Sequence, residues 1–318
     1  MKPLAIVFSD LHLNIWSKFN EDNKRTLDHF KVLFNVKTLC ELYNVPALFC
    51  GDFFHKADGI SIELLELLDT QLGTYNSIYA ISGNHDLKLV NTIKDPKYSL
   101  VKYIANRYNH VECIDFNHTI LSDKFKVMVY GVPYIDHNIG LSDYLKGIQF
   151  KKGYKNILLL HTDYPGARDT DGREIDSVEN LNLNTLNRFD LVLCGHIHKP
   201  QRLSKKVYMI GAPLQQRRTD AKCKLGYWLL YSDLSMEFKE FDGFPKFIDV
   251  ESADDIKNDG NYYTVLPPKA RVQVNTEHKI TKQLSKKSLA KQYMKERGIS
   301  DKNKKNLLIN LLNKAESC

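Results

Sequence analysis

The sequence SIYAISGNHD, residues 77–86, joins a short apolar run to a polar turn. Residues 77–81 are typical of a buried strand, and at Gly83 we expect a positive φ that turns the chain sharply. Asn84, His85 and Asp86 would then extend from the carboxyl end of the strand, where open α/β sheets place their functional sites. Taken alone, such a turn is more often a plain connection between a strand and a helix. Whether it belongs to a functional site depends on the residues at the other strand ends.

Four further predicted strand ends carry side chains of the metal-ligating type. They are Asp10-Leu11-His12, Gly51-Asp52 with His55 after it, His161, and Gly195-His196-Ile197-His198. Residues two apart in an extended segment point to the same side, so each Asp-x-His or His-x-His pair offers two ligands to one point. Imidazole and carboxylate together suit manganese, iron or zinc. A shared carboxylate can bridge two such ions for phosphoryl transfer.

Each motif alone also has a structural explanation. Asp10 could be a capping residue beside a surface histidine, Gly51-Asp52 is a common turn, and His161 could be a hydrogen-bonded core histidine. Gly-His-x-His at a strand end is harder to explain in this way. Because all five motifs follow strands of one chain, a metal centre is the better interpretation.

Strands and helices alternate through the first part of the chain. Apolar runs at residues 2–9, 46–50 and 78–81 predict buried strands, with helices at 22–44 and after Ser61 between them. This alternation is typical of βαβ units in a parallel sheet. A helix is predicted next at 98–107, and further strands at 111–116, 119–121, 126–132, 156–160, 190–194, 207–210, 226–231 and 236–241.

The later strands suggest a second sheet. The close spacing of the strands between residues 111 and 132 favours antiparallel pairing, and a helix is predicted at Leu181–Arg188. The predicted fold class is therefore α/β, a sandwich of two sheets flanked by helices.

Three regions follow from these patterns. Residues 1–242 form the predicted catalytic domain, 243–276 a small α+β domain with a helix at 253–257 and a strand at 262–266, and 277–318 a tail with helices at 281–297 and 301–315. Residues 270–318 hold twelve Lys and Arg against four Asp and Glu, whereas the whole chain has a formal net charge of +7. The basic character therefore belongs to the tail.

Composition excludes several classes of protein. No apolar run approaches the ~20 residues that a membrane span needs, and the N-terminus lacks the apolar core of a signal peptide. The six cysteines are scattered without a Cys-x-x-Cys motif, which favours reduced thiols in a cytoplasm, bacterial or that of a phage-infected host.

In their order, the five motifs resemble those of the calcineurin-like metallophosphoesterases, over residues 10–198. Gly51-Asp52-Phe53-Phe54-His55 looks like the Mre11/SbcD nuclease branch, in which a histidine follows the aromatic residue. The small domain and the basic helical tail agree with that branch. The resemblance implies a metallophosphoesterase fold. It also implies a DNA nuclease, with exonuclease and endonuclease activity, that acts on double-stranded DNA ends together with a Rad50/SbcC-type ATPase in recombination or repair.

Carried over by motif, the resemblance implies two divalent ions, expected to be manganese, with magnesium, iron and zinc as alternatives. One ion would be held by Asp10, His12 and His198, and the other by Asn84, His161 and His196, with Asp52 bridging. His85 would protonate the leaving 3′ oxygen as a general acid or stabilise the transition state, and His55 would position the scissile phosphate or assist His85. Asp86 would support the site through hydrogen bonds.

Contacts with partners are also expected. Arg202, Lys205, Arg217 and Arg218 are candidate contacts to the DNA backbone, with a solvated basic loop as the alternative. Apolar positions in the predicted tail helices form a stripe that is expected to bind the ATPase. The alternative is that the two helices pack against each other as a hairpin. Family members often dimerise through helices near residues 60–110, which predicts a homodimer by analogy. Asn14 and Thr162-Asp163 depart from the family pattern, which leaves the shape of the groove open.

Two other functions stay open at this point. One is a small-molecule phosphatase or cyclic-nucleotide phosphodiesterase of the same superfamily, against which His55 and the basic tail speak. The other is a non-catalytic scaffold that binds DNA ends around a structural metal site, against which the full ligand set speaks.

Overall fold

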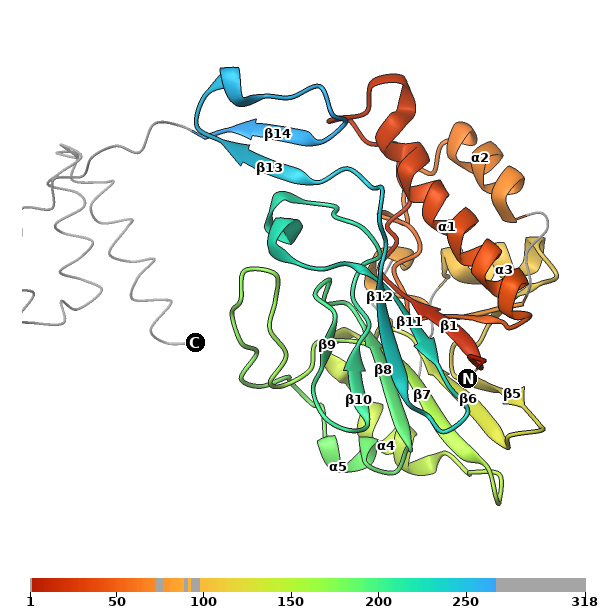
Figure 1. Ribbon diagram of the computed structural model, residues 1–318. Coiled ribbons are helices and arrows are strands. Elements are labelled where there is room, and N and C mark those ends of the chain that lie inside the picture. The colour runs from red at the N-terminus through yellow and green to blue at the C-terminus, as the bar shows by residue number, and fades with distance from the viewer. Residues whose placement is uncertain (1, 73–76, 89–90, 93–97, 267–318) are drawn as a thin grey trace, which may run out of the picture. The chain divides into compact units, whose positions relative to one another are not determined.

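The computed structural model describes residues 2–72, 77–88, 91–92 and 98–266 (Figure 1). In this part of the chain, most strands belong to two six-stranded sheets. The first has the order β12-β11-β1-β2-β3-β4, with bounds Met236–Glu240, Gly226–Leu230, Ala5–Phe8, Ala47–Phe49, Ile78–Ala80 and Val111–Cys113. The second has the order β5-β6-β7-β8-β10-β9, with bounds Asn117–Ser122, Val127–Val132, Lys155–His161, Leu191–Gly195, Val207–Met209 and Gln201–Arg202.

The central strands of both sheets are parallel. β1 to β4 run in one direction, as the alternation of strands and helices predicts, and so do β6, β7, β8 and β10. Strands β5, β9, β11 and β12 add antiparallel edges. Because parallel strands end at the same edge of a sheet, each sheet gathers the residues that follow its strands.

Helices flank the two sheets (Figure 1). α1 (Lys24–Tyr43), α2 (Ile62–Leu72) and α3 (Leu100–Arg107) pack on the first sheet, and α4 (Leu141–Gly147) and α5 (Leu183–Leu186) on the second. Successive strand residues face opposite sides, so Ile6 and Phe8 pack with the helices whereas Ala5 and Val7 face the second sheet. The fold is therefore α/β, with two mixed sheets flanked by helices, as predicted.

Three predicted elements need correction. Antiparallel pairing of residues 111–116 is wrong, because β4 pairs parallel with β3 and the chain then crosses to the second sheet. The helix predicted at 181–188 is only α5, since Asn182 caps it with an extended backbone. The helix predicted at 253–257 is the single 3-10 turn η5 (Ala253–Asp255), after which Ile256 returns to an extended conformation.

β13 (Phe247–Val250) and β14 (Tyr262–Val265) form a separate parallel pair that includes the strand predicted at 262–266. The Tyr262 hydroxyl donates a hydrogen bond to Asp28 Oδ2 on α1 at 3.4 Å, which ties this pair to the helix. The helices predicted at 281–297 and 301–315 lie outside the described residues, and the boundaries at 242 and 276 stay predictions. The described cysteines are free thiols, and no helix among the described residues is long and apolar enough to cross a membrane.

Gly131 of β6 lies where the two sheets approach each other. A Cβ there would come within 2.2 Å of the Ile114 carbonyl oxygen and 2.8 Å of Ile81 Cγ2. We expect Gly131→Ala to lower the free energy of unfolding by about 1–3 kcal/mol through overpacking. Gly147→Ala is the matched control, because nothing lies within 4 Å of its added Cβ. Equal denaturant midpoints for both variants would contradict this packing.

Candidate metal centre

All seven predicted metal ligands come together at the carboxyl ends of the strands. Asp10 and His12 follow β1, Asp52 follows β2, Asn84 follows β3, His161 ends β7, and His196 and His198 follow β8. Two groups result, in which the ligand atoms lie within 4.8 Å of one another: Asp10, His12 and His198, and Asp52, His161 and His196.

Asn84 and Asp52 complete the arrangement. Asn84 Oδ1 lies 3.1 Å from His161 Nε2 and 3.0 Å from His196 Nδ1, which places it in the second group. Asp52 Oδ2 lies 3.5 Å from His12 Nε2 and 3.4 Å from His161 Nε2, so this carboxylate stands between the two groups. This is the position that a bridging ligand needs.

The donor set fits divalent cations. Asp10 and Asp52 are buried carboxylates, and none of the ion pairs among the described residues gives either a Lys or Arg partner. Buried charges require compensation by an opposite charge. Imidazole nitrogens converge beside these carboxylates, with His12 Nε2 and His198 Nε2 only 3.2 Å apart, and a cation bound among them would provide that compensation. Burial alone would raise the pKa of Asp52, but His161 and His12 hold it below its usual range. These residues would therefore hold two ions, three donors for each with Asp52 shared.

The outer nitrogens of three of these histidines also have partners. His161 Nδ1 donates to the Cys50 carbonyl at 2.7 Å, His198 Nδ1 lies 3.4 Å from Asp220 Oδ2, and His196 Nε2 lies 3.6 Å from Asp163 Oδ1. A carboxylate at the outer nitrogen orients an imidazole and raises its basicity as a ligand. Asp220 was not predicted from the sequence, since nothing in Arg217-Arg218-Thr219-Asp220 links it to a histidine more than 20 residues away.

Asp220→Asn should weaken divalent-metal binding about 10- to 100-fold, because the amide cannot support His198 with a negative charge. Asp220 is fully buried and also accepts the backbone N–H of Gln216 at 3.0 Å. Asp249→Asn is the control, because Asp249 pairs with Arg218 of the same loop and touches no ligand. Titration calorimetry decides: an unchanged affinity in Asp220→Asn would remove this residue from the metal site.

Metal binding should also release a proton from His161. Burial lowers the pKa of His161, but Asp52 outweighs this effect and the pKa rises to about 9. An imidazole must be neutral to ligate, so affinity should rise about tenfold per pH unit from pH 7 toward the pKa. Calorimetry in buffers of different ionisation enthalpy measures the proton, and an affinity independent of pH in this range would contradict the assignment.

The backbone of the ligands is not extended as predicted. Asp10, His12, Asp52 and His196 have φ values of 52°, 49°, 60° and 90°. Residues other than glycine rarely adopt this region, and such conformations gather at functional sites, where the surrounding structure imposes them. The pairing of Asp10 with His12 is therefore made by strained turns and not by the alternation of a strand.

Gly83 differs from its prediction as well. Its φ is −88°, so the expected positive φ is wrong. Glycine is needed for another reason: a Cβ would come within 2.1 Å of Asp52 Oδ1. The turn after β3 can therefore approach the bridging carboxylate only without a side chain.

His85 and His55 lie beside the metal ligands. The His85 backbone N–H donates to Asp52 Oδ1 at 2.8 Å, and its Nδ1 donates to the His55 carbonyl at 2.7 Å. The two rings stack with centroids 5.4 Å apart and 17° between their planes. Burial and the proximity of His85 lower the pKa of His55 to about 4.

Asp86 holds the backbone of two turns in place. Its carboxylate accepts the N–H groups of Phe53, Phe54 and Gly83 at 3.1, 2.9 and 2.9 Å. It thereby joins the turn after β2 to the turn after β3. Burial and the Asp52 charge raise the pKa of Asp86 to about 7.

Of the four predicted DNA contacts, one reaches the site. Arg217 lines the pocket over the metal ligands, whereas Arg218 forms an ion pair with Asp249 at 2.5 Å. The Arg202 side chain donates to the Ser204 carbonyl at 3.1 Å, and Lys205 is exposed. Contact of these residues with DNA stays a prediction.

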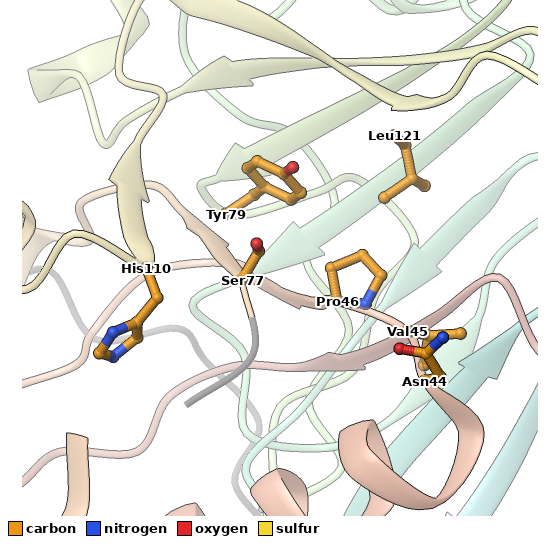
Figure 2. A pocket seen from close by; sticks show the side chains of 7 residues that line it. All are labelled: Asn44, Val45, Pro46, Ser77, Tyr79, His110 and Leu121. Carbon is orange, nitrogen blue, oxygen red and sulfur yellow. The ribbon is translucent and has the colours of Figure 1, made fainter. Parts of the chain in front are cut away.

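Two pockets of similar size show that volume does not identify the site. The pocket over the metal ligands measures about 400 Å³ and includes His85, Asp163, Asp169 and Arg217 in its wall. Another pocket, of about 390 Å³, lies near the amino ends of β2 and β3 and is lined by Asn44, Val45, Pro46, Ser77, Tyr79, His110 and Leu121 (Figure 2). The second contains none of the predicted site residues.

Residues 4–200 match the family model of the Calcineurin-like phosphoesterases, and the chain belongs to this family. It is therefore a metal-dependent phosphoesterase whose His and Asp clusters bind divalent ions, which confirms the resemblance at the level of the family. No curated protein matches the chain. One solved crystal structure aligns over 75% of this chain and 98% of its own, at 12% identity and a TM-score of 0.46.

Proposed function

We propose that the protein is a manganese-dependent DNA nuclease that cuts phosphodiester bonds at double-stranded ends, as the partner of a Rad50/SbcC-type ATPase in recombination or repair. The observation that carries this proposal is the stacked pair of His55 and His85 beside the two ligand groups. Cleavage of a DNA strand expels a strongly basic alkoxide, which needs a proton donor. A proton donor therefore accelerates DNA cleavage more than it accelerates a reaction whose leaving group departs as a stable anion.

The contacts of His85 define how it would act. Because a carbonyl oxygen can only accept, the His55 carbonyl fixes the proton of His85 on Nδ1. His85 Nε2 then carries a proton only in the imidazolium form, and that proton can pass to the leaving 3′ oxygen. The backbone bond to Asp52 at 2.8 Å holds His85 at a fixed place relative to the bridging carboxylate.

The metal ions supply the remaining chemistry when bound: they activate the attacking water and offset the charge of the phosphoryl group. Arg217 in the pocket wall would contact a phosphate of the backbone. Residues 277–318 would bind the ATPase, and the protein would act as a homodimer.

End-labelled linear double-stranded DNA, incubated with Mn²⁺, Mg²⁺ or EDTA, tests this proposal, with His85→Ala as the control. We expect degradation with Mn²⁺ that EDTA abolishes and that His85→Ala largely lacks. If DNA stays intact with the ATPase present while a small aryl phosphodiester is hydrolysed, the proposal is wrong and the protein is a small-molecule phosphodiesterase. If His85→Ala complements a deletion of the gene normally, a non-catalytic scaffold is the better description.

A further inference from the structure

A continuous stack of side chains connects β13 and β14 to the metal centre. It begins at the rings of Phe247 and Tyr262, whose centroids lie 5.1 Å apart. The Arg25 guanidinium lies 5.5 Å and 5.7 Å from these two rings and 3.8 Å from the ring of Trp16. Trp16 packs against His55, with centroids 4.9 Å apart, and His55 carries the carbonyl that fixes His85.

Arg25 lies at the centre of this stack, where burying its charge costs free energy. Its side chain is buried, with 5% of the residue exposed, and burial lowers its pKa. Among the described residues it forms no ion pair with a carboxylate, and its Nε has no hydrogen-bond partner. An apolar side chain of similar volume usually fills such a place at a lower cost in free energy. The charge is therefore retained for something other than filling space.

The hydrogen bonds of Arg25 show what the guanidinium joins. Nη1 donates to the Lys18 carbonyl at 3.1 Å, and Nη2 donates to the Gln216 carbonyl at 2.5 Å. Lys18 belongs to the loop after the Asp10-His12 motif, and the Gln216 side chain donates to the Asp10 carbonyl. Arg25 thus clamps two loops that carry or support metal ligands while its flat face holds Trp16.

We propose that Arg25 is a positioning residue for His55, and through it for His85, and that it couples β13 and β14 to the reaction. This inference rests on the proposed function, since it assigns His85 the role of acid. Trp16 connects Arg25 to His55, because its ring is held between the guanidinium and the His55 imidazole. Sequence patterns give no sign of this coupling, because Trp16, Arg25 and Tyr262 belong to no metal motif.

Kinetics with a small aryl phosphodiester and with DNA test the coupling. Arg25→Met, which keeps length and loses charge, should lower kcat on DNA about 10- to 100-fold, the effect of small misplacements of a catalytic group. The KM for DNA should change little, the melting temperature and the affinity for Mn²⁺ should fall far less than kcat, and Arg25→Lys should restore part of kcat. Lys31→Met is the matched control: Lys31 also lies on α1, with its amine 5.4 Å from the Phe244 ring, but outside the stack. We expect it to behave as the wild type.

A second variant loosens the stack from its far end. Tyr262→Leu leaves Arg25 in place, so a lower kcat with unchanged KM supports coupling even if Arg25→Met fails to fold. A wild-type kcat in Tyr262→Leu and Arg25→Met would overturn the proposal. So would losses of Mn²⁺ affinity and melting temperature that account for the fall in kcat, because these indicate a purely structural role.

Imidazole ¹⁵N resonances of the metal-free protein provide a readout that does not depend on catalysis. Those of His55 and His85 should shift in Arg25→Met and Tyr262→Leu and stay unchanged in Lys31→Met. If the wild type cleaves neither DNA nor the small diester, the proposed function is wrong, yet these resonances still decide whether the stack controls His55. Unshifted resonances in both stack variants would refute the coupling itself.

Discussion

Asp52→Asn should abolish hydrolysis and reduce the number of bound ions. The carboxylate lies 3.5 Å from His12 Nε2 and 3.4 Å from His161 Nε2, between both ligand groups. Asparagine keeps the shape and can still accept the His85 backbone N–H, but it carries no charge to share between two cations. Losing several kcal/mol of charge stabilisation corresponds to a fall in kcat of about 10³-fold or more.

Metal content by elemental analysis and kcat by steady-state kinetics check this result together. Asp115→Asn is the control, since Asp115 is a partly buried carboxylate that accepts from Ser82 N at 2.8 Å and Ser82 Oγ at 2.6 Å, outside the metal centre. It should keep both ions. An Asp52→Asn protein that keeps two ions and normal kcat would show that the bridging role is wrong.

His85→Asn should separate chemistry from metal binding. We expect kcat on DNA to fall about 10²- to 10⁴-fold, the range for loss of a general acid, with the bound metal unchanged. A p-nitrophenyl phosphodiester should be affected much less, because its phenolate leaves without a proton. The difference between the two substrates isolates proton donation from other effects of the substitution.

His118→Asn is the matched control for His85→Asn, because His118 is exposed on β5 and packs beside Tyr130. Its kinetics should equal those of the wild type on both substrates. If His85→Asn instead loses the same factor on DNA and on the aryl diester, His85 stabilises the transition state by another route and donates no proton.

Much of the centre could be predicted from local sequence. A strand that ends in Asp, Asn or His is recognisable in one dimension, and parallel strands bring such ends to one edge, as with Asp52 after β2 and His161 at the end of β7. The assignment of each strand to one of the two sheets was harder to predict from the sequence. Residues 111–116 look like part of a meander, and only the pairing of β4 with β3 shows where the chain crosses between sheets.

The supporting residues were beyond sequence patterns for a physical reason. Asp220 and Arg25 act through tertiary contacts, Asp220 with His198 and Arg25 with Trp16 and Gln216, and such contacts leave no periodicity in the chain. The positive φ of Asp10, His12 and Asp52 is likewise imposed by tertiary structure and is not preferred by those residues. Functional groups that follow regular elements are therefore predictable, whereas the residues that hold them in place are not.

Anomalous diffraction from crystals soaked with Mn²⁺ would locate the ions of the metal centre. We expect two peaks on opposite sides of the Asp52 carboxylate, one among Asp10, His12 and His198 and the other among Asn84, His161 and His196. A single peak, or ions bound away from Asp52, would contradict the two-ion centre and the phosphodiester chemistry that depends on it.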